Sequence, residues 1–226
     1  MMKKVSLLLL LSLFVFSVNA QSEQWSAGTS STLLNLKEKK WDDVDGTPYL
    51  NNGEFVKGEI IQNGKHIKNQ DLRYNAYQDR MEIMVSKDEV YEASKDEDIQ
   101  FVLQYQLLKQ VKYSKDDSVR NGYMFCLSCG DEVSLFKKIS KVYLPAEQAQ
   151  TGYHKDKPAR FKDQEQLYLK IPEYDYAIPL ESSQKKILSQ FEGAEDKLKA
   201  YVKSEKLKLR KEEDLIQLID YYKMIK

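Results

Sequence analysis

The sequence has few of the residues on which most catalytic and metal sites depend. Among 226 residues it contains two histidines, His66 and His154, and two cysteines, Cys126 and Cys129. Catalytic triads that need a histidine therefore have few candidates, and none of these lies in a supporting motif. The patterns Gly-x-Ser-x-Gly, His-Glu-x-x-His and the phosphate loop are also absent from the sequence. We therefore expect no catalytic residues, no metal site and no cofactor, and a protein that is not an enzyme.

The sequence also has no excess of positive or of negative charge. The chain has 35 Lys and Arg residues and 35 Asp and Glu residues, and without Lys3 and Lys4 the balance is 33 basic against 35 acidic. Proteins that bind nucleic acid usually carry a basic face. The balance therefore argues against nucleic acid as a partner, and also against electrostatic binding to a membrane.

The one long apolar run lies at the N-terminus. Lys3 and Lys4 precede the run from Val5 to Val18, and Ala20 ends a stretch of small residues that a signal peptidase can read. This pattern predicts a signal peptide over residues 1–20. The run is shorter than the roughly 20 residues of a membrane span, although an uncleaved anchor remains an alternative. We expect an exported protein of the periplasm or the extracellular space, with no transmembrane span after signal cleavage.

The remaining chain divides by the period of its apolar residues. Residues 21–40 show no period and are expected to form a flexible leader, with a short helix around Leu33 to Leu36 as the alternative. Period-two alternation over 41–180 predicts an antiparallel β domain, and helical spacing over 181–226 predicts a helical segment that packs on it. The fold class is therefore α+β: a β-hairpin or meander sheet, or a partial barrel, of roughly eight strands, followed by two to three C-terminal helices.

Two successive hairpins are expected between Gly46 and Val85. Asn63-Gly64 suits a two-residue type I′ turn, which would place Gln62 opposite Lys65 and Ile60 opposite Ile67. For the second hairpin we take Gln78-Asp79 as the loop, although this pair is a poor type I′ turn and a longer loop remains open. That register pairs Ala76 with Met81, Tyr74 with Ile83 and Leu72 with Val85 on one face. The opposite face then carries Arg73, Asn75, Tyr77, Arg80, Glu82 and Met84.

Further strands are expected downstream. The alternation from Ile99 to Tyr113 favours one long strand, with a helix as the alternative. We expect a turn region over 114–122, a third hairpin whose strands cover 123–127 and 133–142, and a long exposed loop over 145–166. Two short strands should follow, one over Leu167 to Ile171 and one over Tyr174 to Ile178.

The C-terminal segment should begin with a helix capped by Ser182 or Ser183 and ended by Gly193. A second helix should follow from Ala194. The third helix is the best defined, because acidic residues at 212–214 begin it and it carries an apolar stripe. That stripe has spacing i, i+3, i+4 and i+7 and consists of Leu215, Leu218, Ile219 and Tyr222.

The segments Pro48-Tyr49-Leu50, Leu72-Arg73-Tyr74-Asn75 and Met81-Glu82-Ile83, with the C-terminal run from Lys206 to Tyr222, resemble a family of uncharacterised exported β-rich proteins of Gram-negative bacteria. The resemblance implies a β-rich fold closed by C-terminal helices and a place in the bacterial envelope. It implies no activity, so no functional residue is carried over. The Cys126–Cys129 pair is not part of that pattern.

Cys126-Leu-Ser-Cys129 allows three interpretations. In an oxidising compartment the pair can form a structural disulfide, and this requires a turn or bulge because strand residues three apart point to opposite faces. A redox Cys-x-x-Cys pair usually precedes a helix, but a strand pattern follows here. A zinc site would need both histidines to converge on the pair.

One surface patch is a candidate for binding. Arg73, Asn75, Tyr77 and Glu82 share one face of the second hairpin, where they would form a polar and aromatic patch for a ligand or protein. The alternative is a ladder of polar pairs or a buried ion pair that stabilises the sheet. We thus expect a non-enzymatic envelope protein that acts as a binding or interaction module. The alternatives are a small periplasmic redox or hydrolytic enzyme and a structural subunit of an envelope complex.

Overall fold

The computed structural model describes residues 41–87, 89–93, 95, 99–149 and 155–226. The expected signal peptide, the leader and His154 lie outside the described residues. Strands come first along the chain and helices last. The strands are β1 (Val56–Gln62), β2 (Lys65–Asn75), β3 (Arg80–Ser86), β4 (Glu89–Glu92), β5 (Ile99–Leu103), β6 (Gln106–Lys115), β7 (Ser118–Ser128), β8 (Ser134–Leu144), β9 (Arg160–Lys170) and β10 (Ile178–Pro179); the helices are a 3₁₀ turn η1 (Leu50–Gly53), α1 (Gln184–Ser189), α2 (Glu195–Ser204) and α3 (Glu212–Ile225).

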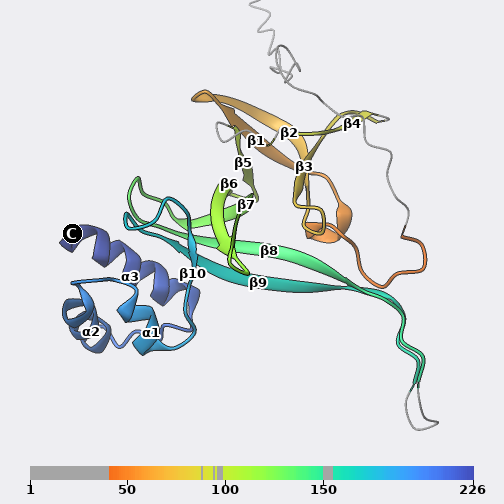
Figure 1. Cartoon of the computed structure of the whole chain (residues 1–226). Helices are drawn as coiled ribbons and strands as arrows, with labels where there is room; N and C mark the ends of the chain where they lie inside the picture. Colours follow the sequence, from red (N-terminus) through yellow and green to blue (C-terminus); the bar gives the residue numbers. More distant parts are fainter. Residues whose placement is uncertain (1–40, 88, 94, 96–98, 150–154) are drawn as a thin grey trace, which may run out of the picture.

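The strands form one antiparallel sheet of ten strands, in the order β10-β9-β8-β7-β6-β5-β1-β2-β3-β4. The helices gather beside β8, β9 and β10, and β1 to β4 lie at the other end of the molecule (Figure 1). This arrangement confirms the α+β class. The order does not return on itself, so the sheet is open and the partial barrel is not confirmed.

The first hairpin has the expected register. Asn63 and Gly64 have φ of 50° and 73°, as a type I′ turn requires. Gln62 pairs with Lys65, and Ile60 pairs with Ile67. The local turn chemistry therefore determines the pairing of β1 with β2.

The expected register of the second hairpin is wrong by two residues. Leu72 lies opposite Ile83, Tyr74 opposite Met81, and Asn75 opposite Arg80, so the loop has four residues instead of two. Asn75 Oδ1 accepts a hydrogen bond from the Gln78 amide at 2.9 Å, which stabilises the longer loop. A slip of two residues leaves each side chain on its expected face.

The region from Ile99 to Tyr113 is extended and not helical, but one long strand is wrong. Gln104 and Tyr105, with φ of 48° and 66°, form a tight turn between β5 and β6. Asp116 and Asp117 form a similar tight turn between β6 and β7. The turn therefore has two residues, and the rest of the expected turn region over 114–122 belongs to the strands. Neither turn contains glycine, which is why the sequence does not reveal them.

The expected loop over 145–166 is also wrong in its second half. β9 begins at Arg160 and pairs with β8 from Leu144↔Arg160 to Ser134↔Lys170. The residues from Lys162 to Gln166 are polar on both faces because this half of the hairpin leaves the core, so no alternation marks it as a strand. The second short strand is reduced to Ile178–Pro179.

Two main cores result. One lies between β1 to β3 and β5 to β7, around Leu72, Tyr74 and Phe101. The other joins the helices to β8 and β9, and the stripe Leu215, Leu218, Ile219 and Tyr222 is buried in it as expected. Ser183 caps α1 by accepting a hydrogen bond from the Lys186 amide.

Candidate functional site

The strands β7 and β8 separate along part of their length. They pair only between Phe125 and Ser128 on β7, and beyond this point β7 continues with β6 while β8 continues with β9. The loop between β2 and β3 fills the base of the gap. Its Asp79 Oδ1 accepts a hydrogen bond from the Tyr123 amide at 3.1 Å, and its Ala76 carbonyl accepts one from the Lys141 amide at 3.1 Å. The loop therefore replaces a missing strand partner on both sides.

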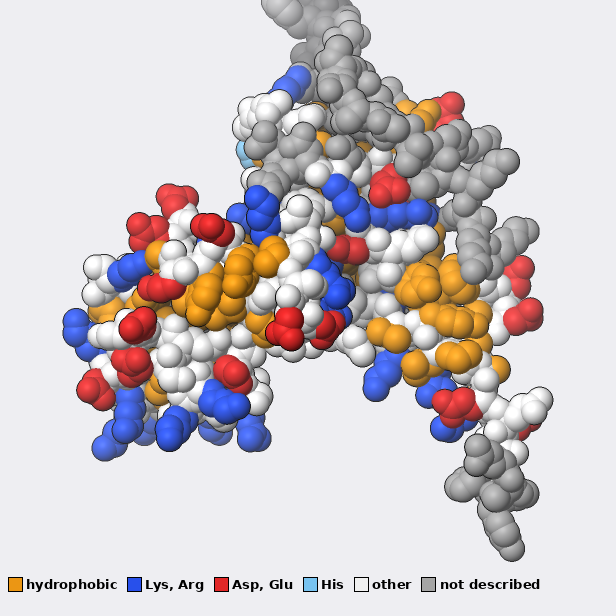
Figure 2. Space-filling model, viewed as in Figure 1, with side chains coloured by type: hydrophobic (Ala, Val, Ile, Leu, Met, Phe, Trp, Pro, Cys, Tyr) orange, Lys and Arg blue, Asp and Glu red, His pale blue; other side chains and the backbone are white. Residues whose placement is uncertain are grey.

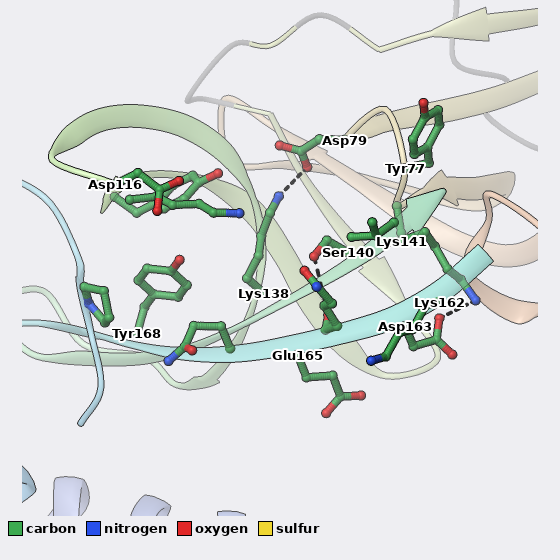
Figure 3. A pocket seen from close by; sticks show the side chains of 17 residues that line it. Tyr77, Asp79, Asp116, Lys138, Ser140, Lys141, Lys162, Asp163, Glu165 and Tyr168 are labelled. Carbon is green, nitrogen blue, oxygen red and sulfur yellow. Dashed lines mark hydrogen bonds and ion pairs between the residues drawn. The ribbon is translucent and has the colours of Figure 1, made fainter. Parts of the chain in front are cut away.

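A buried lysine joins the two hairpins at this point. Lys138 Nζ donates to Asp79 Oδ1 at 2.6 Å (Figure 3). It also donates to the Tyr123 carbonyl at 3.0 Å and to the Tyr74 hydroxyl at 3.4 Å. Burial lowers the pKa of Lys138, while the charge of Asp79 opposes this effect. Burial and the neighbouring Asp79 raise the pKa of Tyr74. Because all three ammonium hydrogens have acceptors, Lys138 acts as a rigid clamp.

Gly122 allows this close approach. A Cβ atom at Gly122 would lie 2.5 Å from Asp79 Oδ2 and 2.9 Å from Lys138 Nζ. Either the carboxylate or the ammonium would have to move to accept a side chain. An isolated glycine within a strand pattern is typical of a close approach of this kind.

An open cleft of about 720 Å³ lies above the clamp, between the end of the β6–β7 hairpin and the outer half of β8 and β9. Its charges have both signs, and its aromatic residues are all tyrosines (Figure 3). The ionisable lining residues are Asp79, Lys115, Asp116, Lys138, Lys141, Lys162, Asp163 and Glu165, with Tyr77, Tyr113 and Tyr168. Burial is the main cause that raises the pKa of Tyr168 to about 12, so this hydroxyl is a neutral hydrogen-bond donor at ordinary pH.

The charges of the cleft are partly engaged with each other. Lys141 Nζ lies 2.5 Å from Asp163 Oδ1, and Asp79 is held by Lys138. Glu165 points away from Asp79 and Lys138 (Figure 3). Lys115 and Lys162 are exposed, and neither forms an ion pair with a carboxylate of the described residues. The cleft can therefore offer hydroxyls and ammonium groups to a polar ligand.

The predicted patch of Arg73, Asn75, Tyr77 and Glu82 is not a surface patch. The side chains of Arg73 and Glu82 are 7% and 1% exposed, and Arg73 Nη2 lies 2.6 Å from Glu82 Oε2. Asn75 is buried as well, whereas Tyr77 is exposed and lines the cleft. The turn η1 and the residues beside it cover this face, so the arrangement favours the buried ion pair over a ligand site at Arg73, Asn75 and Glu82.

Aromatic rings complete the cover over Arg73. Its guanidinium carbon lies 3.9 Å from the centroid of the Tyr49 ring and 4.2 Å from that of Phe55. Arg73 Nη1 donates to the Gly53 carbonyl at 3.0 Å. Tyr77 takes part in a different cluster, with Trp41, Tyr143 and Phe161 at the outer end of the β8–β9 hairpin. Arg73 and Tyr77 therefore belong to two separate aromatic clusters.

Cys126 and Cys129 form a disulfide, with their Cα atoms 5.8 Å apart. The required bulge is present, because Cys126 pairs with Phe136 and Ser128 pairs with Leu135. The pair ends a strand and precedes no helix, which favours a structural disulfide over a redox pair. Lys223 Nζ of α3 donates to the Cys129 carbonyl at 2.9 Å, so the bulge also provides a contact for the last helix.

Among residues 41–87, 89–93, 95, 99–149 and 155–226, no group of three or more His, Cys, Asp and Glu side chains is placed to hold a metal ion. His66 lies in β2 and contacts Glu59 through Nδ1. Within the same residues no helix is both long and apolar enough to cross a membrane.

Comparisons with known proteins identify no relative. No family model matches the chain. No curated protein and no solved structure matches it either. The resemblance to exported β-rich proteins therefore stays a prediction, and function must be argued from the site.

Sequence reasoning missed the central residues of the site. Lys138 and Asp79 come from segments about 60 residues apart, and neither stands in a recognisable motif. Gly122 falls within the expected turn region over 114–122, and only the structure shows that it lies inside β7. The cleft itself depends on where β7 and β8 separate, and no local pattern encodes that point.

Proposed function

We propose that this chain is an exported, non-enzymatic binding protein of the bacterial envelope, and that its ligand is a small polar molecule bound in the cleft above Lys138. Export is supported by the signal-peptide pattern of residues 1–20. The cleft supports the binding role because its volume of about 720 Å³ lies within the usual range for ligand pockets.

One observation favours binding over catalysis. The buried Lys138 at the floor is ion-paired and donates all three of its ammonium hydrogens, so its position is fixed and it has no lone pair with which to act as a base. The exposed charges and the tyrosine hydroxyls around it can orient a ligand. Chemistry at the cleft would need an activated nucleophile, and none is formed by the residues that line it.

The test has two parts. Cell fractionation and N-terminal sequencing of the expressed chain should find it outside the cytoplasm and beginning at Gln21; a cytoplasmic chain that keeps residues 1–20 would refute the export. For the cleft, the purified protein is screened by thermal shift against amino acids, dipeptides and mono- and disaccharides, and by native mass spectrometry for a molecule that co-purifies.

The variant Ser140→Trp fills the cleft, because Ser140 lines it between Lys138 and Lys141. Ser204→Trp is the matched control, since Ser204 is exposed at the end of α2. A ligand whose stabilising effect disappears in Ser140→Trp and persists in Ser204→Trp supports the proposal. A stabilising effect that survives in both variants places the ligand elsewhere.

A further inference from the structure

A second surface, separate from the cleft, has a strong local charge. Between Lys185 and Lys211 the sequence holds nine Lys and Arg residues and four Asp and Glu residues, an excess of five positive charges in a chain of zero net charge. Two of the nine lie in α1, three in α2 and four in the segment 206–211. All nine are exposed. We call these nine residues the basic face.

Few residues of the basic face form an ion pair within the protein. In the described part of the chain, Lys186 is the one member of the face with an ion pair, to Glu181 at 3.6 Å. Of the acidic residues that begin α3, Glu212 pairs away from the face, Glu213 is exposed, and Asp214 lies beside the backbone of Lys208. Glu212 Oε2 accepts from Lys137 Nζ on β8 at 2.8 Å, and Asp214 Oδ2 accepts from the Lys208 amide at 2.7 Å. In Figure 2, blue side chains line the lower edge of the helical unit.

From this arrangement we propose that the basic face binds the surface of a membrane that contains anionic phospholipids. Eight of the nine residues are lysines, which act as point charges on flexible stems and suit a diffuse layer of lipid phosphates. The net charge of the whole chain argued against electrostatic membrane binding. That net charge hides the local excess of positive charge in the basic face.

The composition of the face decides between a membrane and an acidic protein. Protein interfaces are centred on aromatic and other large apolar residues. The exposed large apolar residues of the described chain are Tyr77, Tyr105, Val119, Tyr174 and Met224, and none of them lies between residues 185 and 211. The face therefore lacks the anchors of a protein interface. It also lacks residues that would insert into the bilayer, so the binding is peripheral and salt-sensitive.

The experiment is flotation of the purified chain with vesicles of phosphatidylcholine alone and with about one-third phosphatidylglycerol, at about 50 mM and about 500 mM salt. The test variant changes Lys185, Lys197, Lys199 and Lys203 to Gln. The control changes the same number of exposed lysines on the rest of the chain to Gln: Lys68, Lys87, Lys95 and Lys155. Circular dichroism confirms that both variants are folded.

Each lysine at a membrane surface contributes about fivefold in affinity. We expect binding to the anionic vesicles that high salt abolishes, a loss of about a hundredfold or more in the test variant, and little change in the control. Absence of binding at low salt would overturn the proposal. Equal binding to both vesicle types would overturn it too, because such binding would not depend on anionic lipid.

Polyglutamate is added as a competitor that represents an acidic protein partner. If the chain binds polyglutamate and leaves the vesicles free, the partner is an acidic protein and the membrane proposal is wrong. A defect of equal size in the test and control variants would show that overall charge, and not the basic face, drives binding. None of these outcomes depends on the cleft, so this inference and the proposed function can fail separately.

Discussion

Replacing Glu82 should test whether the interior of the second hairpin depends on a buried ion pair. Glu82 accepts from Arg73 Nε at 3.0 Å, from Arg73 Nη2 at 2.6 Å and from Arg80 Nε at 2.8 Å, and its side chain is 1% exposed. Glu82→Gln keeps the shape but leaves the Arg73 guanidinium buried without a counter-charge. Breaking a buried pair in this way costs about 3–5 kcal/mol of unfolding free energy.

The matched changes separate the charge from the packing. Arg73→Met leaves Glu82 paired with Arg80, and removes the contacts with Tyr49 and Phe55. We expect a loss of about 2–4 kcal/mol, of which the aromatic contacts account for about 1–2 kcal/mol. Arg73→Met combined with Glu82→Gln removes both charges of the pair, so the double variant should be more stable than the sum of the single losses predicts.

The assay is equilibrium unfolding in urea followed by far-ultraviolet circular dichroism, with the midpoint and slope fitted for each variant. An interaction free energy of at least about 1 kcal/mol between the two positions is expected. If Glu82→Gln costs less than about 1 kcal/mol, or if the two single losses are additive, the pair does not stabilise the fold. Arg73 and Glu82 would then again be candidates for a ligand site.

Three further changes test the rest of the structure. Gly122→Ala should lower the unfolding free energy by about 1–3 kcal/mol, because its Cβ would lie 2.5 Å from Asp79 Oδ2; urea unfolding with an unchanged midpoint would contradict the clamp. Replacing Cys126 and Cys129 by Ser should cost no more than about 2 kcal/mol, since the disulfide closes a very short loop, and added reductant should affect only the wild type. The raised pKa of Tyr168, about 12 against 10.0, means that the folded state keeps a proton which the unfolded state loses. The stabilising effect of this bound proton is present below pH 10 and is lost as the pH rises toward 12. The melting temperature of Tyr168→Phe should therefore fall less over that range than that of the wild type. Equal slopes of melting temperature against pH in the two proteins would refute this.

Local patterns in the sequence determined a large part of the fold. Asn63-Gly64 specified a turn with positive φ at both positions, and this set the register of β1 and β2 from the turn as far as Ile60. The apolar stripe of α3 specified which face of that helix would be buried. The odd spacing of Cys126 and Cys129 meant that a disulfide between them would need a turn or a bulge, and the strand contains a bulge. In each case the information lies within a few residues, where backbone geometry leaves few alternatives.

Tertiary structure alone decided which polar residues are inside and where the site lies. The alternation in β2 grouped Arg73, Asn75 and Glu82 on one face, but burial of that face depends on η1 and on Tyr49 and Phe55, which cover it from an earlier segment. The cleft exists because β7 and β8 separate and the β2–β3 loop is held between them by Asp79 and Lys138. Contacts between distant segments leave no period or motif in the sequence, because their geometry is set by the packing of the whole sheet.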